Sequence, residues 1–146
     1  MEKSLNLTTL VFSALPLRSA IGPSVAQAGK PWLGLHDGIK WYFKKTLSTY
    51  RPGRVNFWKL LIPYKRRLPP DAILVVTSPG PFSATRASVS IANALAFAWD
   101  IPVVPVSIEQ LRRTTPMLLA KKAGVAKRTG FSLARRALPQ YNRKPY

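Results

Sequence analysis

The sequence predicts an α/β domain, because a buried strand, a long helix and a second strand follow one another in its central part. The run "AILVVT", residues 72–77, is continuously apolar, as in strands that are covered on both faces. A helix is expected over residues 84–99, with Asp100 and Pro102 ending it, and "IPVVPVS", residues 101–107, predicts the next strand. Strands joined by such a crossover helix run parallel in one sheet.

Three further strands are expected before this unit. The first is the β-rich run of residues 5–15, the second is residues 20–26, which could pair with the first across a turn, and the third is "GIKWYFKKTL", residues 38–47. A short helix over residues 55–62 precedes a proline-bounded basic connection, residues 63–71. The expected order is therefore βββαβαβ in a mixed sheet.

The length of 146 residues suits a single folded lobe. We expect this lobe to span residues 1–107 and to be followed by a basic extension, residues 108–146, that is helical or irregular. One or two short helices are expected around Pro116 in this extension.

The charge of the chain is strongly basic, with 23 Lys and Arg against 5 acidic residues and a formal net charge of +18. The apolar middle, residues 71–102, is nearly neutral, so the positive charge belongs to the two flanking parts. Such a balance favours polyanions such as RNA or acidic proteins. A composition that is 47% hydrophobic and holds four tryptophans nevertheless predicts a folded protein rather than a disordered tail.

Few residues are suited to catalysis. The absence of cysteine excludes disulfides, thiolate metal sites and a cysteine nucleophile, and the single histidine, His36, has no second histidine with which to hold a metal. The five acidic residues are scattered, and the neighbours His36 and Asp37 are interpreted as loop residues, since adjacency in sequence rarely gives a catalytic dyad. The inventory favours a binding or scaffold protein with no cofactor.

The N-terminus has some features of a secretory signal peptide. An apolar run after Lys3 is followed by the small-x-small sequence Ala26-Gln27-Ala28. The charge of Glu2, and the interruption of the segment by Arg18 and Pro23, argue against this reading. No uninterrupted apolar run reaches the roughly 18 residues of a membrane span. We therefore expect a cytoplasmic protein, with secretion as the alternative.

The turn before the predicted helix does not match a known phosphate-binding loop. A helix N-terminus near Ser83 offers free N–H groups, but the segment has Gly80 alone and no lysine, and Pro81 lacks an N–H. Arg86 lies in the first helical turn, where a cation is unfavourable unless it is paired, so structural pairing is favoured over ligand binding.

The predicted helix is apolar nearly all round. Ser88, Ala92, Ala96 and Trp99 follow one another at spacings of four and three. Small side chains permit close approach of another element, which is either the core of the same chain or a partner chain. The pattern alone leaves these two readings open.

The run "SPGPFSATRASVSIANALAFAWDIPVVPVS", residues 78–107, resembles the hallmark of the bacterial TsaB (YeaZ-like) family. Pro79, Gly80, Phe82 and Arg86 match in place, and residues 91–107 are similar to the family's helix and following strand. The ending "LPQYNRKP" also resembles the close of these proteins.

The resemblance implies a single actin-like ATPase-type (ribonuclease H-like) lobe, with the second lobe absent or reduced. It implies a noncatalytic scaffold that pairs with TsaD, with TsaE as a further partner, in threonylcarbamoyladenosine modification of tRNA. A homodimer through the same helix face is a further hypothesis. The resemblance implies two groups of residues: a partner interface on the helix and a structural turn before it. The interface comprises Ser88, Ala92, Leu95, Ala96 and Trp99, and the turn comprises Pro79, Gly80, Phe82, Ser83 and Arg86.

The chain departs from the family at several glycines. Ser78 and Ser88 stand where the family has glycine, and Pro81 and Ala84 also replace family residues of the turn. These departures, with the short length, describe a shortened and diverged member. The alternative function is a basic RNA-binding or ribosome-associated protein with the same fold, and direct contact with tRNA through the basic surface is compatible with both readings.

Overall fold

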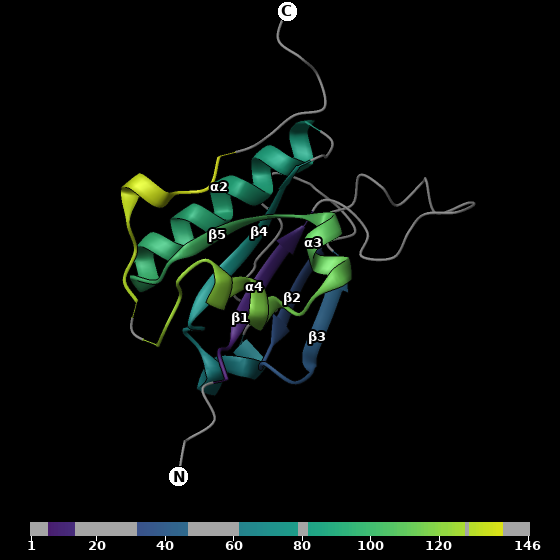
Figure 1. Ribbon diagram of the computed structural model, residues 1–146, viewed down its shortest axis with the longest axis vertical. Coiled ribbons are helices and arrows are strands. Elements are labelled where there is room, and N and C mark those ends of the chain that lie inside the picture. The colour runs from purple at the N-terminus through teal and green to yellow at the C-terminus, as the bar shows by residue number, and fades with distance from the viewer. Residues whose placement is uncertain (1–5, 14–31, 47–61, 79–81, 128, 139–146) are drawn as a thin grey trace, which may run out of the picture.

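A computed structural model describes residues 6–13, 32–46, 62–78, 82–127 and 129–138. Its centre is a five-stranded sheet with the strand order β3-β2-β1-β4-β5 (Figure 1). The strands are β1 (Thr9–Ser13), β2 (Trp32–His36), β3 (Trp41–Thr46), β4 (Ala72–Ser78) and β5 (Val103–Ser107).

The direction of the strands identifies the fold. β2 is antiparallel to both β1 and β3, whereas β4 is parallel to both β1 and β5. β2 therefore runs opposite to the other four strands, which is the arrangement of the actin-like ATPase-type (ribonuclease H-like) lobe. The predicted α/β class and the mixed sheet are confirmed.

The second strand of the meander differs from the prediction. β1 and β3 lie inside two of the expected strands, but the place beside β1 that the prediction gave to residues 20–26 is taken by β2. Residues 20–26 lie outside the described residues. All five residues of β2 are buried, so the strand lacks the polar alternation that would have revealed it.

Gly34 at the centre of β2 is required by a close approach of the next strand. A Cβ atom at this position would lie 2.6 Å from Cζ3 of Trp41 and 2.9 Å from its Cε3. The glycine that looks like a strand breaker in the sequence therefore makes room for the Trp41 ring.

The helix α2 (Phe82–Trp99) begins two residues before the expected start. Ser83 therefore lies within its first turn and is not its N-cap. The end is as predicted: Asp100 adopts a left-handed φ of 53°, its N–H donates to the Phe97 carbonyl at 3.2 Å, and the Ile101 N–H donates to the Ala96 carbonyl at 3.0 Å. This pair of bonds is a Schellman motif, which closes the helix.

The predicted short helices around Pro116 are α3 (Ile108–Arg113) and α4 (Pro116–Lys122). Ser107 and Gln110 form a capping box at the start of α3, and Thr115 caps α4 with Pro116 in its first turn. The 3-10 helix η2 (Ile62–Arg67) lies where a connection was expected, and η3 (Leu133–Arg135) lies near the C-terminus. The expected helix over residues 55–62 lies outside the described residues except for Ile62.

The sheet is covered on both faces (Figure 1). α2 packs over one face, on a core that includes Leu10, Phe12 and Ile73. α3 and α4 pack over the other face, where Leu111 and Leu119 join the second core. The division of the chain at residue 107 stays a prediction. In the part of the chain that the structure describes, no helix has the length and apolar character that crossing a membrane requires.

Candidate partner interface

The small-residue side of α2 faces the sheet of its own chain. Ser88 is 3% exposed, and Ala92 and Ala96 have no exposed surface. Both alanines belong to the core that contains Leu10 and Phe12. Their short side chains let α2 approach the sheet closely, so this side of the helix corresponds to the intrachain reading that the sequence left open.

Three of the five expected interface residues are therefore inaccessible to a partner in the folded chain. Leu95 and Trp99 are half-buried and pack against the same core as Ala96. A charged residue at Ala92 would disrupt the core, so it is unsuitable as a test of partner binding. That α2 contacts a partner stays a prediction. The residues of α2 that a partner could reach are others than Ser88, Ala92 and Ala96.

The outer side of α2 carries an exposed aromatic side chain that the sequence reasoning did not single out. Phe97 is 72% exposed, and its ring meets the Phe131 ring edge to face with centroids 5.7 Å apart. Ala94 and Ala98 are exposed on the same helix, three residues before Phe97 and directly after it. We call Ala94, Phe97, Ala98 and Phe131 the Phe97 patch. Phe97 is the large exposed side chain of this patch, the two alanines are small, and Phe131 is half-buried. Exposed apolar surface that is contiguous in this way is typical of contact surfaces.

The C-terminal segment, residues 129–138, is held on α2 by side-chain bonds. Asn93 donates from Nδ2 to the Ala137 carbonyl at 2.9 Å and accepts from the Ala137 N–H at 3.0 Å. Asp100 accepts from the Phe131 N–H at 3.0 Å. These bonds bring Phe131 beside Phe97. A polar Asn93 within the otherwise apolar residues 91–99 of the helix was the signal in the sequence, and its partner could not be inferred because it lies 44 residues away.

The expected structural turn is described only in part. Pro79 and Gly80 lie outside the described residues, and the backbone of Phe82 and Ser83 forms the start of α2. Arg86 is exposed on the helix. Its structural pairing stays a prediction.

Asp37 lies in the hairpin between β2 and β3, as the loop interpretation expected, whereas His36 is the last residue of β2 and is buried. His36 Nδ1 accepts from the Gly38 N–H at 3.0 Å. Asp37 Oδ1 accepts from the N–H groups of Ile39 and Lys40, both at 2.7 Å. The two side chains therefore hold the turn.

The titration of both groups fits this structural role. Burial lowers the pKa of His36 from 6.5, although the charge of Asp37 acts in the opposite direction. The Lys40 N–H and then the Ile39 N–H keep the pKa of Asp37 below 3.8. His36 is also buried against Trp41, with ring centroids 5.0 Å apart. A neutral, buried imidazole whose Nδ1 is already bonded is poorly placed to exchange protons with a substrate.

Comparison with known proteins gives one family model and several solved structures. Residues 68–118 match the model of the family "TsaD: tRNA N6-adenosine threonylcarbamoyltransferase". Two structures from Pseudomonas aeruginosa are similar to the chain, each at 22% identity. YeaZ matches over 68% of this chain and 44% of its own, with a TM-score of 0.41. An uncharacterized protein with similarity to peptidase YEAZ matches over 69% of this chain and 43% of its own, with a TM-score of 0.42.

The chain thus spans less than half the length of the structures that it matches. The residues that match the family model comprise β4, α2, β5 and α3, together with the first residues of α4. This is the part of the sequence that carries the hallmark around Arg86. The resemblance to TsaB (YeaZ-like) proteins that the sequence predicted is supported by this family match, which covers the unit from β4 to α3.

Proposed function

We propose that the chain is a noncatalytic, TsaB-like partner of a TsaD homologue in threonylcarbamoyladenosine modification of tRNA. The observation that carries this proposal is the match of residues 68–118 to the family of tRNA N6-adenosine threonylcarbamoyltransferase. The sheet order of an actin-like ATPase-type lobe is compatible with it.

A scaffold role is supported by the chemistry of the described residues. The only histidine of the chain is buried and structural, and within the described residues no group of three or more His, Asp and Glu side chains could hold a metal ion. The matching unit also exposes a large apolar side chain, Phe97, on the outer side of α2. A scaffold acts through such a surface, whereas an enzyme needs convergent titratable groups.

The partner surface that we propose is the Phe97 patch. It replaces the buried residues Ser88, Ala92 and Ala96 as the contact region. TsaE and a second copy of the chain are other candidate partners for the same surface. An exposed aromatic ring at the centre of an interface commonly contributes more than 1 kcal/mol of binding free energy.

The test is co-purification with the TsaD homologue of the same organism, followed by size-exclusion chromatography. The wild-type chain should form a stoichiometric complex, and Phe97→Glu should lose it. The matched control is Ile39→Glu, because Ile39 is 77% exposed in the hairpin between β2 and β3 and lies outside the Phe97 patch. Circular dichroism should show both variants folded, since the lost Phe97 and Phe131 contact is worth about 0.5–1.5 kcal/mol.

Two outcomes contradict the proposal in different ways. A wild-type chain that forms no complex with the TsaD homologue removes the scaffold role. A complex that persists with folded Phe97→Glu retains the scaffold role but places the interface elsewhere.

A second candidate, contact with RNA, is favoured by the edge strand β3. Lys44 Nζ lies 5.4 Å from the centroid of the Trp41 ring, and Lys40 Nζ lies 5.9 Å from that of Tyr42. Cations beside aromatic rings suit the phosphates and bases of single-stranded RNA. Under this function, RNA affinity should fall steeply with salt, and Lys44→Gln should lower the salt slope by about one. Affinity that is independent of salt would exclude it.

A further inference from the structure

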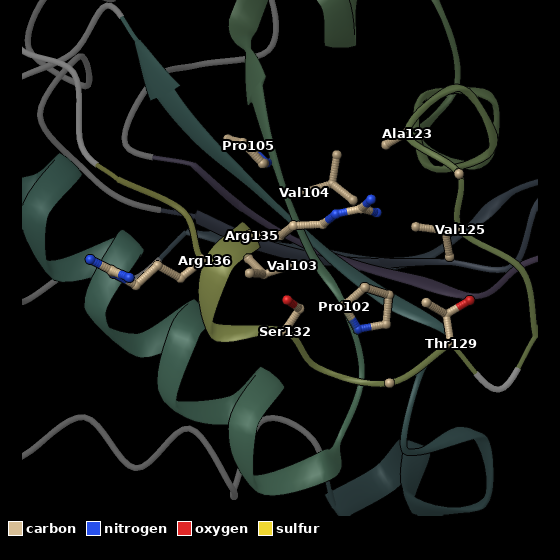
Figure 2. Close-up of a pocket in the computed structure, with 12 residues that line it drawn as sticks. Pro102, Val103, Val104, Pro105, Ala123, Val125, Thr129, Ser132, Arg135 and Arg136 are labelled. Carbon is tan, nitrogen blue, oxygen red and sulfur yellow. The ribbon is translucent and has the colours of Figure 1, made fainter.

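A cavity of about 710 Å³ lies beside the edge strand β5 (Figure 2). It is bounded by Pro102 and the first three residues of β5, by residues 123–125 after α4, and by the C-terminal segment from Thr129 to Arg136. Arg135 extends over the other lining residues, whereas Arg136 points away from them toward α2 (Figure 2). A volume of this size is within the range of ligand sites in proteins.

Among the residues that the structure describes, the backbone of β5 has one side without a neighbouring strand. In this part of the chain β5 pairs with β4 alone, and the Ile73 N–H donates to the Pro102 carbonyl at 3.0 Å. In a parallel pair, alternate residues direct both backbone groups to the same side. Val104 therefore faces β4, and the N–H and carbonyl of Val103 and the carbonyl of Pro105 face outward.

The charge around this edge is positive. The described lining of the cavity includes Arg135 and Arg136 and no acidic residue, and Lys121 and Lys122 are exposed at the end of α4. The acidic side chains nearest in sequence to β5 are already engaged. Asp100 accepts from the Phe131 N–H, and Glu109 forms an ion pair with Arg112 at 2.6 Å.

We propose that this cavity binds an acidic peptide segment in extended conformation, which adds as a strand beside β5. The outward groups of Val103 and Pro105 would bond its backbone, and Arg135 would contact its carboxylates. Apolar side chains of the segment would pack on Val104 and Val125, which are part of the lining. The proposal is independent of the Phe97 patch and of any TsaD partner.

Two features of the lining favour a short peptide over other polyanions. No aromatic side chain is among the described lining residues, so these offer nucleic-acid bases no ring on which to stack. Pro105 lacks the N–H that a longer added strand would need, so the pairing is confined to a few residues.

The experiment measures binding of a fluorescent, end-blocked peptide of alternating valine and glutamate to the full chain. Arg135→Glu should weaken binding by about tenfold or more, as expected for a lost charge-assisted bond. Arg113→Glu is the matched control, because Arg113 is exposed on α3 and does not line the cavity, and it should bind like the wild type.

Backbone methylation of the peptide tests the added strand without changing the protein. Peptides are N-methylated at alternate residues in the two complementary patterns, of which one blocks the N–H groups that face β5. One pattern should abolish binding and the other should preserve it. The proposal is overturned by no binding, by equal affinity of the two methylated peptides, or by an unchanged affinity of Arg135→Glu. It is also overturned if a single-stranded oligonucleotide binds tighter than the peptide and is equally weakened by Arg135→Glu.

Discussion

The side-chain amide of Asn93 and the backbone of Ala137 exchange two hydrogen bonds, at 2.9 and 3.0 Å, in the way that two strands of a sheet do. This relationship joins the middle of α2 to the C-terminal segment. Ala137 is 1% exposed and belongs to the core beneath α2. One amide side chain therefore satisfies two backbone groups at a position where water has little access.

Asn93→Ala should lower the free energy of unfolding by about 2–4 kcal/mol, because it leaves the N–H and carbonyl of Ala137 without partners. Asn93→Asp should cost less, since a carboxylate still accepts from the Ala137 N–H. Ser90→Ala on the exposed side of the same helix is the control and should cost almost nothing. Urea denaturation measures all three, and equal stability of the two Asn93 variants with the wild type would contradict the role of these bonds.

His36 should make stability depend on pH. Burial lowers the pKa of His36 below 6.5, so the unfolded chain takes up a proton before the folded chain does. The contribution of neutral His36 to the free energy of unfolding is complete above pH 6.5. It is lost as the pH falls from 6.5 through the lower pKa that His36 has in the folded state. His36→Gln should flatten this part of the curve.

The measurement is the urea midpoint at several pH values around 6.5, all kept well above 3.8, the ordinary pKa of the Asp37 carboxyl. In this range Asp37 remains ionised in both the folded and the unfolded chain. An identical pH dependence in the wild type and in His36→Gln would assign the effect to another group.

Gly34→Ala should be strongly destabilising for its size, by about 1–3 kcal/mol, because the new Cβ would lie 2.6 Å from the Trp41 ring. Trp41→Leu removes that ring and costs stability by itself. The double variant should lose less stability than the sum of the two single variants. Strict additivity in denaturation experiments would mean that the two side chains do not compete for the same space.

Thr9→Val should be neutral or stabilising by up to about 1 kcal/mol. Thr9 has no exposed surface, and within the described part of the chain its Oγ1 has no hydrogen-bond partner. Valine has the same shape without the hydroxyl that must be desolvated. Thr9→Ser, which retains the hydroxyl and loses the methyl group, is the control and should destabilise. A destabilised Thr9→Val would indicate that the hydroxyl is bonded in solution.

The parts of the fold that the sequence predicted are those with a strong local signal. The run of residues 72–77, the long helix and its end at Asp100 were predicted because apolar continuity and a stop signal do not depend on distant contacts. β2 was missed because its five residues are all buried and its central Gly34 looks like a breaker until Trp41 is placed above it. The burial of β2 and the position of the Trp41 ring both depend on tertiary contacts, which a local sequence pattern does not contain.

The candidate site was harder to predict for a similar reason. A helix that is apolar nearly all round does not reveal which side meets the sheet, so Ala92 and Ala96 were equally suited to a core and to an interface. Whether Phe97 is exposed depends on which side of the helix packs against the sheet, so the sequence alone did not predict its exposure. The cavity beside β5 is formed by segments that are distant in sequence, and no local pattern of residues indicates it.

The bond between Asn93 and Ala137 has a consequence for the order of events on the ribosome. All five strands and α2 are complete by residue 107, whereas the partner of Asn93 is made 30 residues later. Domains generally fold as units, so a nascent chain in which residues 129–138 are still missing cannot complete the packing around α2. Until that segment is made and released, the Asn93 amide and the Phe97 ring lack the partners that the folded chain gives them.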